Sequence, residues 1–242
     1  QDGASDTEVV TITIHGSNDV PVLSVNNNGT LTEDSGTALS TSGSLSYIDA
    51  DSSDTHTVDH VYNGDMVWSG GTLTGEHVGA LVAGFTVDMD SWDYNVSNEL
   101  VDFMADGETI TFSHNITVTD EHGASDSEVV TVTIYGKNDA PDLTVDSEGS
   151  VTEDTGTTVI ASGDLSFTDP DVTDTHSVMM SYNGDAVWTG GELTGGQEVS
   201  VVYSYAVDAD GWEYNQLNSR LNFIAAEETI TLLKNQGLAA KI

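Results

Sequence analysis

The sequence predicts an all-β protein built from antiparallel β-sandwiches in tandem, and three observations support this prediction. First, the chain repeats itself without a gap at an offset of 120 residues, and about half of the positions in residues 21–110 are identical to those in 141–230. Second, apolar and polar residues alternate in short β-branched stretches. Third, dipeptides typical of tight turns separate these stretches. A period of this length indicates repeated domains, because solenoid repeats are only about 20–45 residues long.

The repeat predicts the domain boundaries. Residues 20–139 form one complete β-sandwich repeat, and residues 140–242 form a second whose C-terminal strands are missing or divergent after about residue 231. Residues 1–19 contain GASDTEVVTITIHGSND, which matches GASDSEVVTVTIYGKND at residues 123–139. We therefore expect residues 1–19 to be the terminal strand of a preceding repeat. The match also predicts that copies of the chain exchange this strand, because an unfilled sheet edge accepts a strand of matching sequence.

Within each repeat, strands are expected where β-branched residues alternate, as in residues 108–112, 115–119 and 128–135. Only residues 96–107 are expected to form a helical turn. Hairpin turns are expected at Asn63-Gly64, Gly70-Gly71, Asn183-Gly184, Gly190-Gly191 and Asp210-Gly211. Short strands with turn signals about every 8–12 residues favour a cadherin-like or immunoglobulin-like Greek-key sandwich.

The charge balance excludes several functions. The chain has 41 Asp and Glu against 4 Lys and Arg, a formal net charge of -37. This excludes nucleic-acid binding through a basic face and electrostatic docking on an anionic membrane. Hydrophobic residues make up 37% of the chain, which indicates a folded protein rather than a disordered polyelectrolyte.

The chain has no Cys, so neither disulfides nor thiolate metal sites stabilise it. Stability must then come from packing, and hard cations bound by oxygen atoms are a further source to consider. No apolar stretch is long enough to insert into a membrane, and the polar N-terminus does not resemble a signal peptide. If the protein is secreted, we expect its signal to lie elsewhere.

Several motifs resemble the VCBS repeats of giant bacterial RTX-type surface adhesins, whose units are cadherin-like or immunoglobulin-like. They are LTED (31–34), LSYIDAD (45–51), VDMDSWDY (87–94), ADGETI (105–110), ITVTDEHGA (116–124) and VTVTIYGKNDAP (130–141). The resemblance implies an extracellular, secreted stalk or spacer segment on the bacterial cell surface, which supports cell adhesion or biofilm formation. It also implies that neighbouring repeats of the same chain are its partners and that their junctions bind Ca²⁺.

The first candidate calcium ligands lie at the repeat junctions, in Asn18-Asp19-Val20-Pro21 and Asn138-Asp139-Ala140-Pro141. Calcium takes six to eight oxygen ligands from carboxylates, amides and backbone carbonyls, and these linkers supply all three. Such a site would stiffen the joint. The alternative is a simple Asx-turn before proline.

Acidic residues that recur in register are the second set of candidates. They are Glu33, Asp34, Asp49, Asp51 and Asp54 with their counterparts Glu153, Asp154, Asp169, Asp171 and Asp174. In an extended chain Asp49 and Asp51 lie on the same side, so one cation can bind both if Asp54 folds back. Asp120 and Asp126 are secondary candidates. The alternative for each carboxylate is a solvated acidic loop; the acidic set at residues 88–92 is instead predicted to be a hairpin.

The sequence also bears on two other functions. Catalysis is not expected, because only His56 and His176 recur among the histidines and no nucleophile, zinc-helix or phosphate-loop motif occurs. A carbohydrate-binding module would use exposed aromatics such as Trp68, Trp92 and Tyr62, with polysaccharide as the partner. Core packing is the favoured role for each Trp.

Overall fold

The computed structural model describes residues 2–152, 156–182, 186–188, 205–217, 230–232 and 237–241. The chain divides into two compact units. Unit 1 comprises Gln1–Val101 and Glu108–Tyr135, and unit 2 comprises Asp102–Gly107 and Gly136–Ile242.

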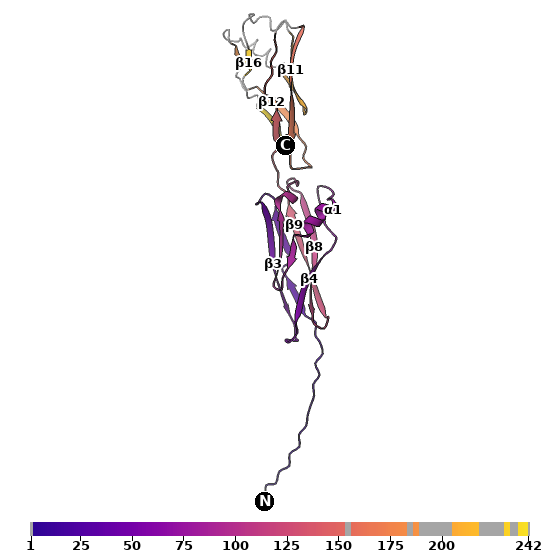
Figure 1. Ribbon diagram of the computed structural model, residues 1–242. Coiled ribbons are helices and arrows are strands. Elements are labelled where there is room, and N and C mark those ends of the chain that lie inside the picture. Colours follow the sequence, from indigo (N-terminus) through magenta and orange to yellow (C-terminus); the bar gives the residue numbers. More distant parts are fainter. Residues whose placement is uncertain are drawn as a thin grey trace. The chain divides into compact units, whose positions relative to one another are not determined.

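Unit 1 is a sandwich of two sheets (Figure 1). The first sheet is antiparallel and contains, in order, β1 (Val22–Val25), β3 (Ala38–Ile48), β7 (Ser91–Ser97) and β6 (Phe85–Val87). The second contains, in order, β2 (Asn28–Thr32), β9 (Ser125–Tyr135), β8 (Thr109–Asp120) and β4 (His56–Tyr62), with β5 (Val67–Trp68) also paired to β8. Only the β2–β9 pair is parallel. The predicted all-β fold of antiparallel sandwiches is confirmed.

The core of unit 1 lies between the two sheets. Along each strand every second side chain points inward, and these side chains meet there. Trp92 on β7 is fully buried, and its indole Nε1 donates to the carbonyl of Asn26 at 2.7 Å. Gly29 lies so close to the ring that a Cβ there would be 2.7 Å from Trp92 Cη2, so this position requires glycine. The predicted core role of Trp92 is confirmed, and its ring offers no exposed platform for a sugar.

Two of the expected strands form one. Residues 108–112 and 115–119 were expected as separate strands, but β8 runs through both because Ser113 and His114 are buried rather than in a turn. Its first part pairs with β5 and its second part with β4. The Ser113 N–H and hydroxyl donate hydrogen bonds to Asp65 at 2.9 and 2.6 Å, so the polar atoms of this buried residue are satisfied.

His114 is an unusual core residue, because its side chain is fully buried among aromatic rings. It stacks on Phe85 with ring centroids 4.1 Å apart, and its Nδ1 lies 3.0 Å from Nδ1 of His60. Burial, followed by the nearby His60, lowers the pKa of His114 to about 4, although Asp65 acts in the opposite direction. The imidazole is therefore neutral in the folded protein over most of the acidic range.

Lowering the pH from about 6.5 to 4 is therefore expected to destabilise unit 1. The unfolded chain binds a proton at His114 in this window and the folded chain does not, so the linked loss is about 3 kcal/mol below pH 4. Chemical denaturation between pH 4 and 7 measures it. His114→Phe should flatten the pH dependence, whereas His15→Phe, in the exposed segment, should not. Equal slopes for both variants would contradict a role for His114.

One helix was missed by the sequence prediction. The expected helical residues 96–107 contain only the 3-10 turn η1 (Asn98–Leu100), and the helix α1 is at Gly75–Val82. Thr74 caps α1, since its side chain accepts from the N–H of His77 at 3.2 Å. Leu81 anchors the helix in the core. The two glycines within α1 disfavour a helix, so packing of Leu81 and the cap decide the structure.

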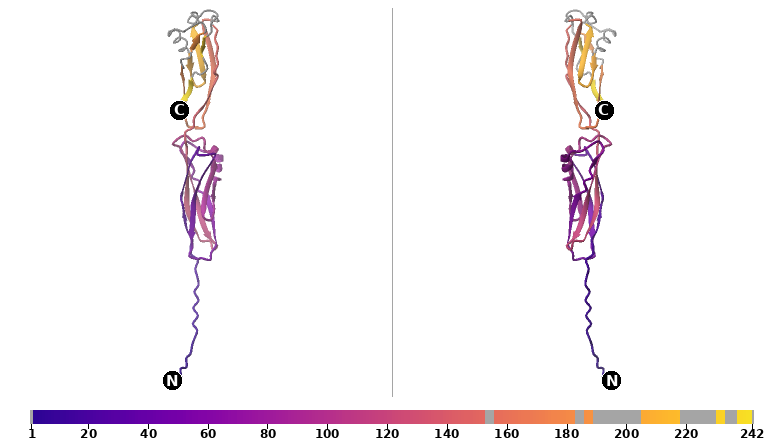
Figure 2. Two further views of the ribbon diagram at one scale, coloured as in Figure 1. Left: turned by 90° about the vertical axis from the view of Figure 1, so that its left-hand side faces the viewer. Right: turned by 90° about the vertical axis from the view of Figure 1, so that its right-hand side faces the viewer.

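Unit 2 repeats the first sheet of unit 1 in register. Its antiparallel sheet contains, in order, β10 (Asp142–Val145), β11 (Thr158–Thr168), β15 (Gly211–Leu217) and β14 (Tyr205–Val207). Every pair matches its unit 1 counterpart at an offset of 120 residues. Trp212 replaces Trp92, and its indole donates to the Asp146 carbonyl at 2.6 Å. In Figure 2 the strands of this sheet run from pink at β10 to yellow-orange at β15.

The other described strands of unit 2 form two pairs. β13 (Ala186–Trp188) pairs with β16 (Ile230–Leu232) in the register that β5 has with β8, and β12 (Ser177–Ser181) pairs with β17 (Gly237–Lys241). The sequence after residue 231, which diverges from the repeat, therefore contains a strand.

Candidate metal centre

Acidic residues gather where the chain enters unit 1, and strand pairing explains why. Asp49, Asp51 and Asp54 lie between β3 and β4, and Asp120 ends β8. Because β4 and β8 are antiparallel with His56 opposite Asp120, the β3–β4 loop and the β8–β9 turn lie at the same end of the sandwich. The linker before Pro21 enters at this end.

The linker is hydrogen-bonded to both loops. The Asn18 side chain donates through Nδ2 to Asp120 Oδ2 at 2.9 Å, and the Asp19 N–H donates to Asp51 Oδ2 at 2.7 Å. Carboxylate oxygens of Asp49, Asp54 and Asp120 lie within 4.8 Å of one another. We call Asn18, Asp19, Asp49, Asp51, Asp54 and Asp120 the entry cluster.

Asp120 holds the β8–β9 turn together. Its Oδ1 accepts from the N–H groups of His122 and Ala124, each at 2.9 Å, and the residue is only 5% exposed. The hydrogen bond from Asn18 is the main cause that lowers the pKa of Asp120, with backbone N–H groups adding to it against the effect of burial. The carboxylate therefore stays ionised beside its acidic neighbours.

Asp49 is ionised for a similar reason. Its Oδ2 lies 2.8 Å from His56 Nε2, and its Oδ1 accepts from the Asp51 N–H at 2.9 Å. The hydrogen bond from His56 is the main cause that lowers the pKa of Asp49. The recurrent His56 thus orients an acidic side chain of the entry cluster.

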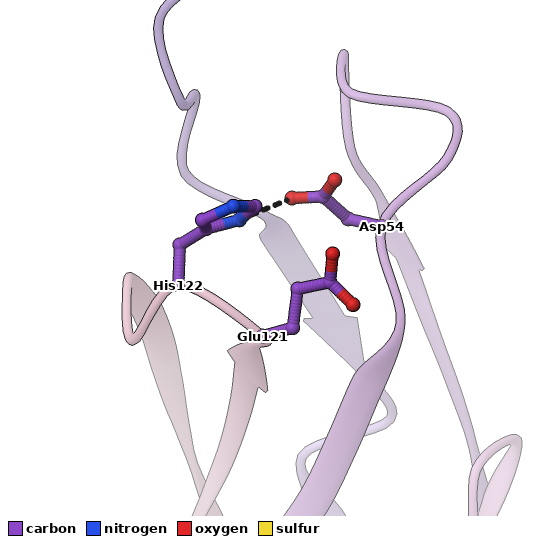
Figure 3. Close-up of side chains that lie close together, drawn as sticks. All are labelled: Asp54, Glu121 and His122. Atoms are coloured by element: carbon purple, nitrogen blue, oxygen red, sulfur yellow. Dashed lines mark hydrogen bonds and ion pairs between the residues drawn. The ribbon is translucent and has the colours of Figure 1, made fainter.

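A second group adjoins the entry cluster and shares Asp54 with it (Figure 3). Ligand atoms of Asp54, Glu121 and His122 lie within 4.8 Å of one another, and His122 Nδ1 is 3.1 Å from Asp54 Oδ2. This hydrogen bond raises the pKa of His122. The sequence prediction singles out Asp120 and Asp126 of this loop, but neither Glu121 nor His122. Their position directly after Asp120 was the available signal.

Unit 2 reproduces part of this arrangement. The Asp139 N–H donates to Asp171 Oδ2 at 2.8 Å, the Asp171 N–H donates to Asp169 Oδ1 at 3.0 Å, and His176 Nε2 lies 2.7 Å from Asp169 Oδ2. The Asp174 N–H bonds to the Asp171 carbonyl at 3.1 Å, as Asp54 does to Asp51 at 3.0 Å. At the sequence offset of 120 residues from Asp120, however, stands Ala240, which pairs with Val178 and so does not lie opposite His176 as Asp120 lies opposite His56.

The structure separates Glu33 and Asp34 from the entry cluster. They follow β2, which is parallel to β9, so they lie at the opposite end of unit 1. The Glu33 N–H donates to the Tyr135 carbonyl at 3.1 Å, and the Asp34 N–H donates to Asn98 Oδ1 at 2.7 Å. Their counterparts Glu153 and Asp154 lie outside the described residues.

Three further predicted residues have local partners. Asn138 donates to the carbonyl of Asp139, its neighbour in the linker. Asp126 accepts from the Leu23 N–H at 2.8 Å and joins β1 to the start of β9. Asp88 forms part of the β6–β7 hairpin through its N–H bond to the Ser91 carbonyl at 2.8 Å, which confirms the predicted hairpin.

Comparisons with known proteins give low similarity. No family model matches the chain, and no curated protein matches it. Among solved structures, the human desmocollin-1 ectodomain is 10% identical with a TM-score of 0.33, and the match covers 91% of this chain and 37% of that one. The cadherin domains 1–4 of protocadherin gamma B7 are 12% identical with a TM-score of 0.29, covering 93% and 64%.

A third solved structure, the Dpr2 Ig1-Ig2 complex with DIP-Theta Ig1-Ig3, is 10% identical with a TM-score of 0.27, covering 92% of this chain and 96% of that one. At these scores the three likenesses carry no argument, so the fold is assigned from the strand pairing alone. The VCBS resemblance stays a prediction. Within the described residues, no helix is both long and apolar enough to span a bilayer.

Proposed function

We propose that this chain is an extracellular adhesion-type repeat segment whose entry cluster binds Ca²⁺ and thereby stiffens the step from the linker into unit 1. One observation carries the proposal: the linker residues Asn18 and Asp19 are hydrogen-bonded to the two loops whose carboxylates converge. A cation held by Asp49, Asp54 and Asp120 would fasten these loops, and the linker bonded to them, in one geometry.

The donor set fits calcium. The entry cluster offers carboxylate oxygens, an Asn amide and backbone carbonyls, which are the hard oxygen ligands that Ca²⁺ prefers. The chain contains no Cys, so the softer thiolate sites of zinc are absent from its chemistry. Glu121 adds a carboxylate beside Asp54, whereas His122 is hydrogen-bonded to Asp54 through Nδ1.

Charge supports the same conclusion. The sequence has no Lys or Arg before Lys137, so no basic side chain of unit 1 other than His can balance the converging carboxylates. The lowered pKa values of Asp49 and Asp120 keep both ionised. Like charges this close repel, and a divalent cation is the counter-charge that removes the repulsion.

The biological setting follows from the repeat. Motifs such as LTED at 31–34 and VTVTIYGKNDAP at 130–141 support assignment to the stalk or spacer of a large bacterial surface adhesin. There the segment would hold an adhesive domain away from the cell, and rigidity at each linker would preserve that distance. The Asp19 N–H donates to Asp51, and the Asp139 N–H donates to Asp171 in the same way. This supports the same stiffening of the linker in each repeat.

Calcium titration of the whole chain tests the proposal. Ca²⁺ is expected to raise the melting temperature and to bind with measurable heat, since a ligand present at 100 times its Kd adds about 2.7 kcal/mol to the stability of the folded state. Asp49→Asn with Asp54→Asn should abolish the unit 1 contribution. The matched control, Asp88→Asn with Asp90→Asn, removes the same charge from a hairpin outside the cluster. Equal calcium responses of the two double variants would sink the proposal.

A further inference from the structure

The turn between β4 and β5 is tied to the middle of β8 by polar side chains that the candidate metal centre does not use. The turn comprises residues 63–66, between Tyr62, where β4 ends, and Val67, where β5 begins. β4 pairs with the second part of β8 and β5 with its first part, so the turn crosses β8 near Ser113. Gly64, at a φ of +74°, allows the chain to reverse there.

Ser113 has the surroundings of an activated nucleophile. Its hydroxyl donates to Asp65 Oδ2 at 2.6 Å, and the residue is only 7% exposed. Burial acts to raise the pKa of Asp65, but the hydrogen bonds from the side chain and the N–H of Ser113 outweigh it and lower the pKa below its ordinary value. Asp65 is therefore ionised at neutral pH, and it is placed to accept the hydroxyl proton as an adjacent base does for serine nucleophiles.

A side-chain amide lies against the same hydroxyl. Asn63 Nδ2 donates to Ser113 Oγ at 2.7 Å. Because an amide C–N bond is about 1.33 Å long, Asn63 Cγ lies no more than about 4 Å from that oxygen, near the distance of about 3–3.5 Å from which a nucleophile attacks.

The backbone holds these groups in place. The Asn63 N–H donates to the Ser113 carbonyl at 3.0 Å, and the Met66 N–H donates to the Tyr62 hydroxyl at 2.8 Å, so both ends of the turn are fixed. The base, the nucleophile and the amide are thus gathered before any reaction, which removes much of its entropic cost.

We propose that Ser113 and Asn63 form an intramolecular ester that cross-links the β4–β5 turn to β8. Asp65 takes the hydroxyl proton while Ser113 Oγ attacks Asn63 Cγ, so an O–C bond forms and the carbon becomes tetrahedral. The C–N bond then breaks, and the nitrogen takes the proton from Asp65 and leaves as ammonia. One hydroxyl and one amide become one ester and one ammonia, Asp65 returns to its starting state, and no co-reactant is consumed.

The second repeat supplies a matched comparison in the sequence. It retains the turn as Asn183-Gly184-Asp185, outside the described residues, but Leu233 stands at the offset of 120 residues from Ser113 and has no hydroxyl. The ester is therefore not expected at Asn183. An Asn-Gly sequence can also lose ammonia when the Gly nitrogen attacks the Asn side chain, and Asn183-Gly184 reports this background reaction.

Mass spectrometry of the whole chain tests the proposal. The chain is expected to weigh less than its sequence by one ammonia. Cleavage after glutamate separates residues 34–76 from 109–121, so these peptides should be recovered joined through Asn63 and Ser113. A chain of full mass after prolonged incubation at neutral pH would overturn the proposal. So would equal ammonia loss at Asn63 and Asn183 without a joined peptide.

Substitutions assign the roles of the residues. Ser113→Ala removes the nucleophile and Asp65→Ala removes the base, and both variants should keep the full mass of their sequences. Asp59→Ala is the matched control, since Asp59 is exposed on β4 and accepts from the N–H of His60, and it should form the ester like the parent chain. A joined peptide in Ser113→Ala, or equal loss of the ester in Asp59→Ala and Asp65→Ala, would contradict these roles. The joined peptide of the parent chain decides the proposal even if a variant fails to fold, and neither measurement involves calcium.

Discussion

Replacing Trp92 with alanine is expected to lower the free energy of unfolding of unit 1 by about 3–5 kcal/mol, which is the range for deleting a buried Trp. The indole is fully buried, stacks near Phe85 with centroids 5.6 Å apart, and donates a hydrogen bond to Asn26. Gly29 and Gly43 lie against the ring. Because neither has a side chain, neither can fill the cavity that the substitution leaves. The variant therefore loses transfer energy, dispersion contacts and a hydrogen bond together.

Urea denaturation followed by far-ultraviolet circular dichroism measures this loss. Trp68→Ala is the matched control, since Trp68 lies on the short strand β5 and is only half-buried, with its indole bonded to Glu108 at 2.9 Å. The control should lose much less stability than Trp92→Ala. If both variants unfolded at the same urea concentration, Trp92 would not be the centre of the core. If Trp92→Ala were as stable as the parent chain, the buried ring would contribute nothing, contrary to the geometry.

Replacing Asp120 with asparagine is expected to weaken Ca²⁺ binding to unit 1 by about 100-fold, the upper end of what removal of even an outer-shell partner costs at a metal site. The Asn side chain keeps the Oδ1 acceptor for the N–H groups of His122 and Ala124, so the β8–β9 turn should survive. It removes one negative charge from the point where Asp49, Asp54 and Asp120 converge. Its Nδ2 would face the Asn18 Nδ2 donor, so the hydrogen bond from the linker is lost as well. The expected effects are therefore on calcium affinity and on the linker contact, whereas the β8–β9 turn is retained.

Calorimetric titration measures this affinity, with Asp126→Asn as the control in the same region. Asp126 is also an aspartate near the β8–β9 turn, but its Oδ2 is used by the Leu23 N–H and it is not among the converging carboxylates. Its variant should bind calcium like the parent chain. An unchanged affinity for Asp120→Asn, or an equal decrease for both variants, would remove Asp120 from the site.

The candidate site was predictable in part. Asp49 and Asp51 recur in the second repeat, and so do the linker residues Asn18 and Asp19. This recurrence predicted residues that the structure does bring together. Glu33 recurs in the same way but lies at the opposite end of unit 1. Recurrence identifies a residue that the repeat retains, and it does not say at which end of a sandwich that residue lies.

The contribution of the β8–β9 turn to the candidate metal site could not be predicted from the sequence. Asp120 was a secondary candidate, while Glu121 and His122 were not named, because 66 or more residues separate them from the loop they meet. The helix α1 was missed because its two glycines disfavour a helix, whereas the burial of Leu81, which anchors it, depends on tertiary packing. Local propensity carries no information on such contacts.

The sequence by itself determined the repeat, the strands and the acidic, Lys-poor character of unit 1, because alternation and turn chemistry are properties of neighbouring residues. Only the tertiary structure decided which acidic residues meet. The antiparallel pairing of β4 with β8 brings Asp120 to Asp49 and Asp54, and the parallel pairing of β2 with β9 takes Glu33 and Asp34 to the other end. Strand direction and register depend on partners far apart in the chain, and a shift in either would assemble a different set of carboxylates.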